Sequence, residues 1–415
     1  MGIHRQTSVI PVPAAALYRW HAQPGALIRL TPPWERVEVV EKGEGIDPGA
    51  RVVMRVRLGP LKKTWEALHI APEALPAGAL GFADEQVKGP FASWVHQHRM
   101  LPAGAAASTL EDEVHYTLPL EPVSRWVAGW FVRRKLRRMF AFRHRRTLHD
   151  VMRHFTAEVS PMRIAISGAS GLIGTALTGF LQTGGHTVVP LVRGTAGPGE
   201  IAWSVKDQTI DAAALEGFDA VIHLAGAPVA DGRWTDARKT LIRDSRVDGT
   251  RLLATALAGL ERKPKVFVSA SAVGFYGDRA AEPLDEDSAP GTGFLADVCA
   301  AWEAAAEPAR TAGIRVVHPR IGVVLSPQGG ALDKMLTPVK FGVAGKIGDG
   351  KQYMSWIALD DVLGAMLHII ATDAIEGPVN FTAPTPVTNK AFMKTLGRVL
   401  RRPTVLPLPA FAVKT

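Results

Sequence analysis

Three glycines at three-residue spacing, Gly168, Gly171 and Gly174, form a pattern that can hold a phosphate group. The apolar run 164–166 before them predicts a buried parallel strand, and an apolar helical pattern begins at residue 175. At such a junction backbone N–H groups converge, the helix dipole favours negative charge, and missing side chains let a pyrophosphate approach. We therefore predict a dinucleotide site here; the alternative is a tight strand–helix turn without a ligand. The predicted contacts in this turn are Gly168, Ser170, Gly171, Leu172, Ile173 and Gly174.

The end of the next predicted strand, 186–192, distinguishes NAD from NADP. An NAD site places Asp or Glu there, about 20 residues past the glycines, to bind the ribose 2′-OH. No acidic residue occurs from 175 to 199, and Arg193 stands at that position. Because a guanidinium group suits a 2′-phosphate, we predict NADP, with Val192 and Arg193 as contacts. The alternative for Arg193 is an exposed charge at a strand end.

The composition indicates a globular protein of two domains. The chain has 415 residues, of which 47% are hydrophobic and 21% charged, and a single core rarely grows beyond about 250–300 residues. We find no apolar run long enough for a transmembrane segment and no secretory signal. The single cysteine, Cys299, excludes an internal disulfide framework. We therefore expect a cytoplasmic protein.

The first 156 residues read mostly as strands separated by Gly, Pro and Ala connectors, which predicts an antiparallel sheet. A short helix is predicted at 13–22, and one long helix follows Ser124 as a plausible N-cap. The predicted strands are 34–42, 51–58, 64–70, 80–87, 93–100 and 108–118. The apolar stripe of the long helix consists of Val132, Leu136, Met139, Phe140, Leu148, Val151, Met152 and Phe155.

The long helix is also strongly basic. Residues 121–150 contain nine Arg and Lys side chains but only two acidic ones, Glu121 and Asp150, in a chain of net charge +9. A solvated helix face explains this most simply. A surface for an acidic partner, nucleic acid or an anionic membrane is the alternative, and we do not predict a nucleic-acid partner.

His96 and His98 are two residues apart in a predicted strand, so their side chains share one face. They could bind a metal or act on a ligand, or they could be ordinary half-buried strand residues. The sequence places no third ligand beside them, so no metal site is predicted.

Residues 84–98, DEQVKGPFASWVHQH, resemble the strand–GPF–strand hairpin of the START-like, polyketide-cyclase-like superfamily. The resemblance covers most of residues 1–156 and implies an α+β helix-grip domain. Such a domain holds an apolar ligand between its sheet and its long helix.

Strand and helix signals alternate through residues 162–415. Strands are predicted at 219–224, 265–269 and 315–319, and helices at about 236–260 and 293–312. This alternation predicts an α/β Rossmann domain with a doubly wound parallel sheet.

This second half resembles the extended and atypical short-chain dehydrogenase/reductases, and more closely the NAD(P)-dependent epimerase-like group. The matching stretches include GASGLIG at 168–174, VIHLAGAPV at 221–229, SASAVGFYG at 269–277 and RIGVVLSPQGGAL at 320–332. The resemblance implies that Leu224, Ala225 and Gly226 line the adenine–ribose side of the cofactor, that Arg246 holds its phosphates or ribose, and that Val324 passes near the nicotinamide. It also implies that related proteins continue with further C-terminal helices, so this chain looks C-terminally truncated beside them.

Catalytic residues are harder to predict, because the family's Tyr-x-x-x-Lys pair is missing. By the resemblance Leu295 and Cys299 occupy the Tyr and Lys positions, with Glu303 following. Ser271 is the best candidate to hydrogen-bond a substrate oxygen, ahead of Ser269, and Tyr276 could carry the proton. Tyr276 could instead be a packed loop tyrosine. Cys299 could be a reactive thiol or a small buried apolar side chain.

The glycine-rich segment 329–361 has features of a substrate lid, in which Trp356 and Asp361 would line the cavity. Together these features predict an NADP-binding epimerase- or reductase-like protein that acts on a small carbonyl or sugar-like substrate. The alternative is a non-catalytic NADP-dependent sensor or scaffold, which the missing Tyr–Lys pair favours.

Overall fold

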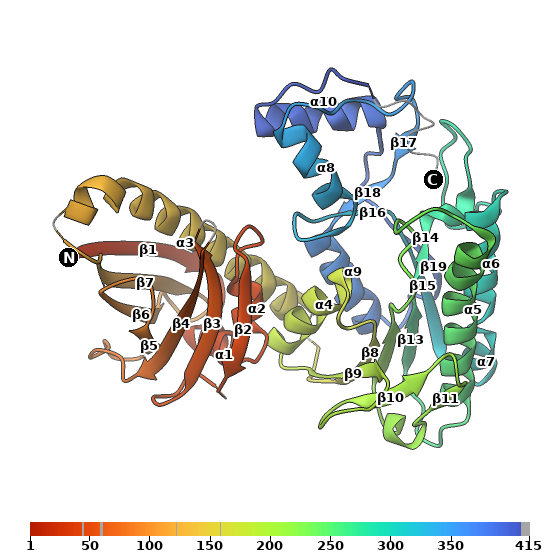
Figure 1. Ribbon diagram of the computed structural model, residues 1–415. Helices are drawn as coiled ribbons and strands as arrows, with labels where there is room; N and C mark the ends of the chain where they lie inside the picture. Colours follow the sequence, from red (N-terminus) through yellow and green to blue (C-terminus); the bar gives the residue numbers. More distant parts are fainter. Residues whose placement is uncertain (44, 59–60, 122, 158, 408–415) are drawn as a thin grey trace. The chain divides into compact units, whose positions relative to one another are not determined.

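The computed structural model describes residues 1–43, 45–58, 61–121, 123–157 and 159–407. The chain forms two compact units, which are described separately (Figure 1). The N-terminal unit consists of Met1–Ser160 with Gly179–Gly185, and the C-terminal unit of Pro161–Thr178 with His186–Thr415.

The N-terminal unit is built on a seven-stranded antiparallel sheet in the order β1-β7-β6-β5-β4-β3-β2 (Figure 1). Two short helices, α1 (Ala14–Ala22) and α2 (Ala26–Leu30), and the long α3 (Val123–Ala157) complete it, as expected for a helix-grip domain. The strands are β1 (Gly2–Ile10), β2 (Val37–Lys42), β3 (Arg51–Leu58), β4 (Leu61–Ile70), β5 (Leu80–Lys88), β6 (Ser93–Pro102) and β7 (Ser108–Thr117).

Strand β1 and helix α2 were not predicted. Residues 2–10 carry mostly polar side chains with an alternating burial pattern, and their sequence does not stand out as a strand. They become one by pairing with β7 about a hundred residues away, from Gly2 opposite Tyr116 to Ile10 opposite Ser108. Long-range pairing of this kind is decided by tertiary structure rather than by local propensity.

Of the eight residues in the predicted apolar stripe of helix α3, three are buried, four are partly buried and one is exposed. Leu136, Phe140 and Val151 are buried, whereas Phe155 is 53% exposed, so its place in the stripe was wrong. An apolar stripe drifts around the axis of a helix as long as this one, which has 35 residues. Among the residues of α3 whose burial the structure describes, the exposed arginines are Arg133, Arg134, Arg137, Arg138 and Arg145. The side chain of the predicted cap, Ser124, lies outside the described residues.

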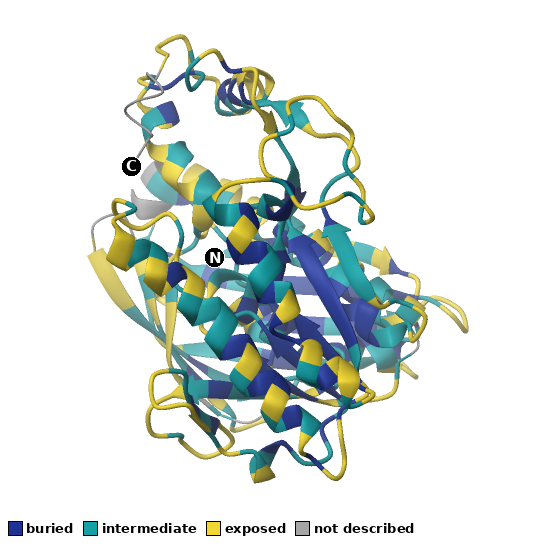
Figure 2. Ribbon diagram, turned by 90° about the vertical axis from the view of Figure 1, so that its right-hand side faces the viewer, coloured by how far each residue is buried: buried dark blue, intermediate teal, exposed yellow. Residues whose placement is uncertain are grey.

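The C-terminal unit contains the predicted parallel sheet, in the order β11-β10-β9-β8-β12-β13-β15-β14 with β19 beside β15. Its central strands are fully buried, as the dark blue strands of Figure 2 show. The chain runs from β8 outward to β9 and β10, then returns to β12 on the other side of β8. This reversal is the topological switch point where α/β sheets bind ligands.

The remaining elements frame that sheet. The strands are β8 (Arg163–Ser167), β9 (Thr187–Arg193), β10 (Ile201–Ser204), β11 (Thr209–Ile210), β12 (Ala220–His223), β13 (Val266–Ser269), β14 (Ser271–Ala272), β15 (Arg315–Ile321), β16 (Val323–Leu325), β17 (Tyr353–Met354), β18 (Trp356–Ala358), β19 (Gly377–Phe381) and β20 (Val387–Thr388). The helices are α4 (Leu172–Thr183), α5 (Asp236–Ala258), α6 (Phe294–Ala304), α7 (Glu307–Thr311), α8 (Gly330–Lys340), α9 (Leu359–Ala371) and α10 (Asn389–Leu400).

One predicted helix of this unit, 293–312, is in fact two, α6 and α7. Pro308 lies in the first turn of α7, where its missing N–H is tolerated, and it could not continue an α-helix from α6. Among the described residues, no helix combines the length and the apolarity that crossing a bilayer requires.

Candidate functional site

The glycine turn joins β8 to the start of α4, and its backbone geometry requires glycine at two positions. Gly168 has a φ of +74°, and a Cβ there would lie 2.9 Å from the backbone nitrogen of Ala225. A Cβ on Gly174 would lie 2.1 Å from the carbonyl oxygen of Gly168. At the exposed Gly171, by contrast, a Cβ would meet only the Gly168 carbonyl oxygen, at 3.2 Å. The space beside Gly171 is therefore largely open.

Two other predicted segments border this turn. Leu224 and Ala225 follow β12 directly and form the backbone against which Gly168 packs. The segment after β16 approaches Leu172, since a Cβ on Gly330 would lie 3.4 Å from Leu172 Cδ2 and 3.8 Å from the Val324 carbonyl oxygen. The fold thus brings the glycine turn, residues 224–226 and Val324 to one edge of the sheet.

Arg193 ends β9, the strand next to β8, and its side chain is exposed. Within the described parts of the chain, we find no ion pair or hydrogen bond made by its guanidinium group. The preceding residue, Val192, is half-buried and pairs with Ala202 of β10. Arg193 is therefore an uncommitted cation at the carboxyl end of the strand.

Arg246 lies under the loop that contains Gly226. Its Nη1 donates to the carbonyl oxygens of Ala227 and Ile242, both at 3.0 Å, and burial lowers the pKa of its guanidinium group. A Cβ on Gly226 would lie 3.2 Å from Arg246 Cζ. The arginine thus fixes the path of this loop beside the turn.

These residues fit a dinucleotide with a 2′-phosphate. The pyrophosphate needs a cradle without side chains at a helix N-terminus, and the glycine turn provides it. The 2′-phosphate needs a guanidinium group that has no other partner, and Arg193 offers one.

The predicted catalytic side chains lie elsewhere in the same unit, in a largely buried group that we call the Arg320 network: Ser271, Tyr276, Glu303, Arg320 and Asn380. Arg320 donates to both carboxylate oxygens of Glu303, through Nε and Nη2, each at 2.9 Å. Ser271 Oγ donates to Glu303 Oε1 at 2.6 Å. Tyr276 donates its hydroxyl proton to Asn380 Oδ1 at 2.7 Å and accepts from Arg320 Nη1 at 3.0 Å. Ser271 and Tyr276 are brought together, but each hydroxyl is already hydrogen-bonded inside the protein.

Arg320 is the residue of this network that the sequence analysis missed. Burial alone would lower its pKa, but the hydrogen bonds to Glu303 and Tyr276 outweigh burial and raise it. Its guanidinium carbon also lies 3.6 Å from the centroid of the Phe275 ring. The available signal was a second arginine near the end of a strand, RVVHPRI, whose central residues are mostly apolar.

The positions that the family resemblance assigns to Tyr and Lys hold no substitute pair. Cys299 is 4% exposed and packs with Phe275 and Tyr276, and burial and the nearby Glu303 raise the pKa of its thiol to about 11. It behaves as a small buried apolar side chain, which was one of the two interpretations of this residue.

The segment 329–361 contains the helix α8 and the short strands β17 and β18. Trp356 donates its indole N–H to the Thr385 carbonyl oxygen at 3.1 Å, and Asp361 is exposed at the start of α9. Neither the Trp356 hydrogen bond nor the exposure of Asp361 tests the prediction that this segment is a substrate lid.

The N-terminal unit holds a second buried polar group, which we call the Asp112 cluster: Asp84, His96, His98, Asp112 and His144. As predicted, His96 and His98 share one face of β6, and their ring centroids lie 3.7 Å apart. The sequence analysis missed the other three members, because β5, β7 and α3 bring them in from distant positions. Only their alternation with apolar neighbours signalled that they point into the core.

Electrostatics hold this cluster in a charged state. Burial alone would raise the pKa of Asp84 and of Asp112, but the neighbouring imidazoles outweigh burial and lower both. Conversely, burial alone would lower the pKa of His96, and the two carboxylates raise it. Both carboxylates are therefore ionised at neutral pH.

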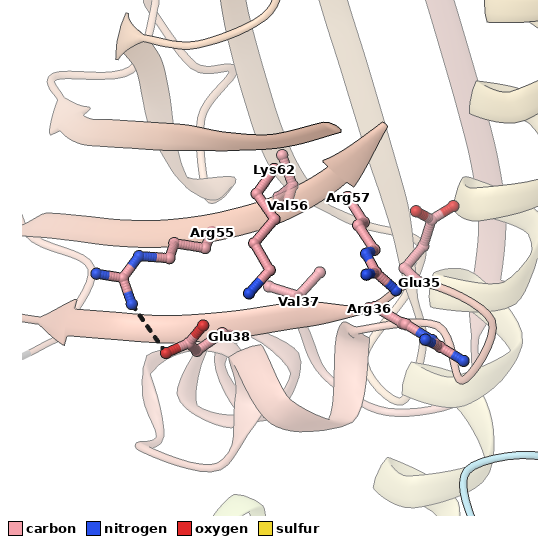
Figure 3. A pocket seen from close by; sticks show the side chains of 8 residues that line it. All are labelled: Glu35, Arg36, Val37, Glu38, Arg55, Val56, Arg57 and Lys62. Carbon is pink, nitrogen blue, oxygen red and sulfur yellow. Dashed lines mark hydrogen bonds and ion pairs between the residues drawn. The ribbon is translucent and has the colours of Figure 1, made fainter. Parts of the chain in front are cut away.

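A surface hollow of about 470 Å³ lies along the β2–β3 edge of the same unit, with Arg36, Arg55, Arg57 and Lys62 around it (Figure 3). Glu38 pairs with Arg55 across it, at 3.0 Å. None of the predicted site residues lines this hollow. Charged side chains of this kind protect an edge strand from pairing with other chains.

Comparison with known proteins identifies both halves of the chain. Residues 164–381 match the model of the NAD dependent epimerase/dehydratase family, which is more than half of the chain. The chain belongs to the NAD dependent epimerase/dehydratase family. Residues 10–142 match the polyketide cyclase/dehydrase and lipid transport family, which confirms the predicted START-like domain as well as the Rossmann domain.

Individual members of the family agree with this assignment. An epimerase family protein of Mycobacterium bovis is 44% identical over 252 residues, which cover 60% of this chain and 83% of that protein. A crystal structure named as a nucleoside-diphosphate sugar epimerase from Corynebacterium glutamicum is 34% identical, with a TM-score of 0.80, and covers 98% of this chain and 85% of that one. The structure of the human epimerase family protein SDR39U1 with NADPH is 34% identical, with a TM-score of 0.55, and covers 60% of this chain and 84% of that one.

Proposed function

We propose that this chain binds NADP(H) at the Gly168–Gly174 turn and acts as an epimerase- or reductase-like enzyme on a small carbonyl or sugar-like substrate. The observation that carries the proposal is the cradle at the switch point with the uncommitted guanidinium group of Arg193 beside it. The family relationship supports it, as does the NADPH in the human SDR39U1 structure. When bound, the cofactor would supply or accept a hydride.

Different residues of this chain would then bind different parts of the cofactor and the substrate. The glycine turn and the first turn of α4 would hold the pyrophosphate, and Arg193 the 2′-phosphate. Leu224, Ala225 and Gly226 would allow the close approach of the adenosine half, because the side chains at 225 and 226 are small or absent. Val324 would border the nicotinamide end. In this proposal Ser271 and Tyr276 polarise the substrate oxygen, which requires Tyr276 to give up its hydrogen bond to Asn380.

Fluorescence titration with NADPH and NADH tests the cofactor. We expect the wild type to prefer NADPH, and Arg193→Glu to lose that preference by at least tenfold because a carboxylate repels the 2′-phosphate. Arg251→Glu is the matched control: Arg251 is an exposed arginine of α5 in the same unit, and its substitution changes the net charge equally. Full NADPH preference in Arg193→Glu would overturn the assignment.

A second candidate function is an NADP-dependent sensor or scaffold without turnover. The specific observation in its favour is that both candidate hydroxyls, of Ser271 and Tyr276, are bound within the Arg320 network, and that Leu295 and Cys299 replace the usual pair. Single-turnover measurements of NADPH oxidation with a panel of carbonyl compounds separate the two. Oxidation that Tyr276→Phe abolishes supports the enzyme; bound NADPH that no compound oxidises supports the sensor.

The N-terminal unit would contribute an apolar ligand to either function. We base this on its match to a family that includes lipid transport proteins. Mass spectrometry of small molecules that co-purify with the full chain tests this proposal, and a protein free of such molecules after native purification counts against it.

A further inference from the structure

We propose that Asp84, His96 and His98 form a binding site for one first-row divalent cation of the zinc or ferrous-iron class, with Asp112 fixing the two imidazoles from behind. This site lies wholly within the N-terminal unit and is independent of the NADP proposal. It goes beyond the sequence analysis, which predicted no metal.

The spacing of the three ligand atoms suits a shared ion better than it suits direct hydrogen bonds. Asp84 Oδ2 lies 3.3 Å from His96 Nδ1 and 3.4 Å from His98 Nε2. Charge-assisted N–H···O bonds are shorter, about 2.7–2.9 Å. Two ligands bound at about 2.0–2.1 Å to one tetrahedral ion lie about 3.3–3.4 Å apart. One ligand atom from each of the three residues falls within 4.8 Å of the others.

Asp112 approaches the same two imidazoles from their opposite nitrogens at shorter distances. Its Oδ1 lies 3.0 Å from His96 Nε2 and 2.7 Å from His98 Nδ1, although the His98 ring is not aligned with the carboxylate as a hydrogen bond requires. These distances are shorter than the spacing of about 3.3–3.4 Å between two ligands of one tetrahedral ion. Asp112 would therefore act as a supporting carboxylate, which orients metal-bound histidines through the ring nitrogen that does not bind the ion.

The proton inventory of the cluster leads to the same site. A neutral imidazole carries one ring N–H, so when His96 Nε2 donates this N–H to Asp112, its Nδ1 presents a lone pair to Asp84. A lone pair that faces a carboxylate oxygen repels it unless positive charge lies between them. Two protons would create two imidazolium rings 3.7 Å apart in the core, whereas a single divalent cation satisfies both rings and balances both carboxylates.

The surroundings of the cluster hold this arrangement in place. His96 is 2% exposed and His98 7%, and Phe82 stacks on His98 with the ring centroids 4.0 Å apart. His144 Nε2 lies 2.8 Å from the second oxygen of Asp112, and its Nδ1 lies 2.9 Å from Ser8 Oγ. Two imidazoles with one carboxylate favour zinc or ferrous iron over magnesium or calcium, which prefer oxygen ligands. Three protein ligands leave at least one coordination position for water or for an oxygen atom of a bound ligand.

Cobalt(II) titration of the full chain tests the site, after the protein has been stripped with a chelator and any histidine tag removed. We expect a visible ligand-field spectrum that saturates at one ion per chain and is displaced by Zn²⁺. Asp84→Asn, which preserves shape, and His98→Ala should each weaken binding at least a hundredfold. Asp112→Asn should weaken it about 10–100-fold, as loss of a supporting carboxylate does.

His115→Ala is the matched control. His115 lies on β7 next to Val114, the residue opposite His96, so its side chain points to the other face of the sheet. It should bind Co²⁺ like the wild type. Circular dichroism reports whether each variant is folded. A folded wild type that gives no ligand-field band overturns the proposal, as does a folded Asp84→Asn variant that binds as tightly as the wild type.

Discussion

The two buried polar groups of this protein differ in how completely their members satisfy one another. In the Arg320 network, the guanidinium group meets a carboxylate through two parallel hydrogen bonds, and both hydroxyls have a partner at 2.6–2.7 Å. In the Asp112 cluster, the carboxylate of Asp84 faces two ring nitrogens at 3.3 and 3.4 Å without a direct bond of normal length. The comparison teaches that buried charged groups can either satisfy one another fully or leave room for a ligand. The distances between their polar atoms distinguish the two cases.

Removal of Arg320 should cause the largest loss of stability. Arg320→Met leaves the largely buried Glu303 without its counter-charge, which costs up to about 3–5 kcal/mol in the free energy of unfolding. Arg279→Met is the control, because Arg279 pairs with Glu282 at the surface and should contribute less than about 1 kcal/mol. Urea unfolding, monitored by hydrogen exchange in peptides of β15, measures the stability loss of each variant. Equal stability losses for the two substitutions would show that Arg320 does not stabilise the network more than a surface ion pair does.

Metal loading should stabilise the N-terminal unit alone. If the Asp112 cluster binds Zn²⁺, a free concentration one hundred times the dissociation constant adds about 2.7 kcal/mol to the stability of that unit. Hydrogen exchange of peptides from β5, β6 and β7 should slow with Zn²⁺ and recover with a chelator, while peptides from β13 and β15 stay unchanged. Slowing in both units would point to non-specific binding.

Acidification should destabilise the C-terminal unit through two buried histidines. Burial lowers the pKa of His223 and of His318 to about 4, so both are neutral in the folded state at pH 7. Because the unfolded chain binds protons near pH 6.5 and the folded one only near pH 4, stability is lost as the pH falls through this window. At pH 5 the loss is about 2 kcal/mol for each histidine, as an upper estimate.

Urea unfolding of the C-terminal unit at pH 7.5 and pH 5 measures this loss. His318→Gln should remove part of the pH dependence, since glutamine does not titrate. A variant with the full pH dependence of the wild type would contradict the assignment to His318.

Single hydroxyl deletions in the Arg320 network should have smaller effects. Ser271→Ala and Tyr276→Phe each remove one hydrogen bond and should cost about 1 kcal/mol in the free energy of unfolding. Their effect on NADPH oxidation carries more information. A loss of 10²–10⁴-fold in kcat would mean that the hydroxyls also serve catalysis, and unchanged kcat would leave them a structural role.

Cys299 should give the smallest effect. Its thiol is buried, with a pKa raised to about 11, so we expect no reaction with a thiol reagent in the folded protein at pH 8. Reaction should appear only when urea unfolds the C-terminal unit. Rapid labelling of the native protein would show that the core beside Tyr276 opens.

Much of the cofactor half could be predicted because its signals are local. The glycine turn, the strand before it and the helix after it are contiguous, and the family match confirmed the Rossmann domain. The predicted element boundaries mostly agreed with the structure within a few residues. The prediction of one helix over 293–312 was wrong because Pro308 was taken as part of a single helical pattern, whereas it begins a second helix. Arg193 was identified from spacing alone, and its part in cofactor choice stays a prediction.

The sequence by itself determined where the glycine turn lies and which runs are apolar, since turn composition and hydrophobic periodicity depend on neighbours along the chain. Only the tertiary structure decided which polar side chains meet. Arg320 joins Tyr276 from 44 positions away, and Tyr276 joins Asn380 from 104. Asp112 meets His144 across 32 positions. Strand register and helix packing set these encounters, and they depend on the burial of the whole core rather than on any local pattern.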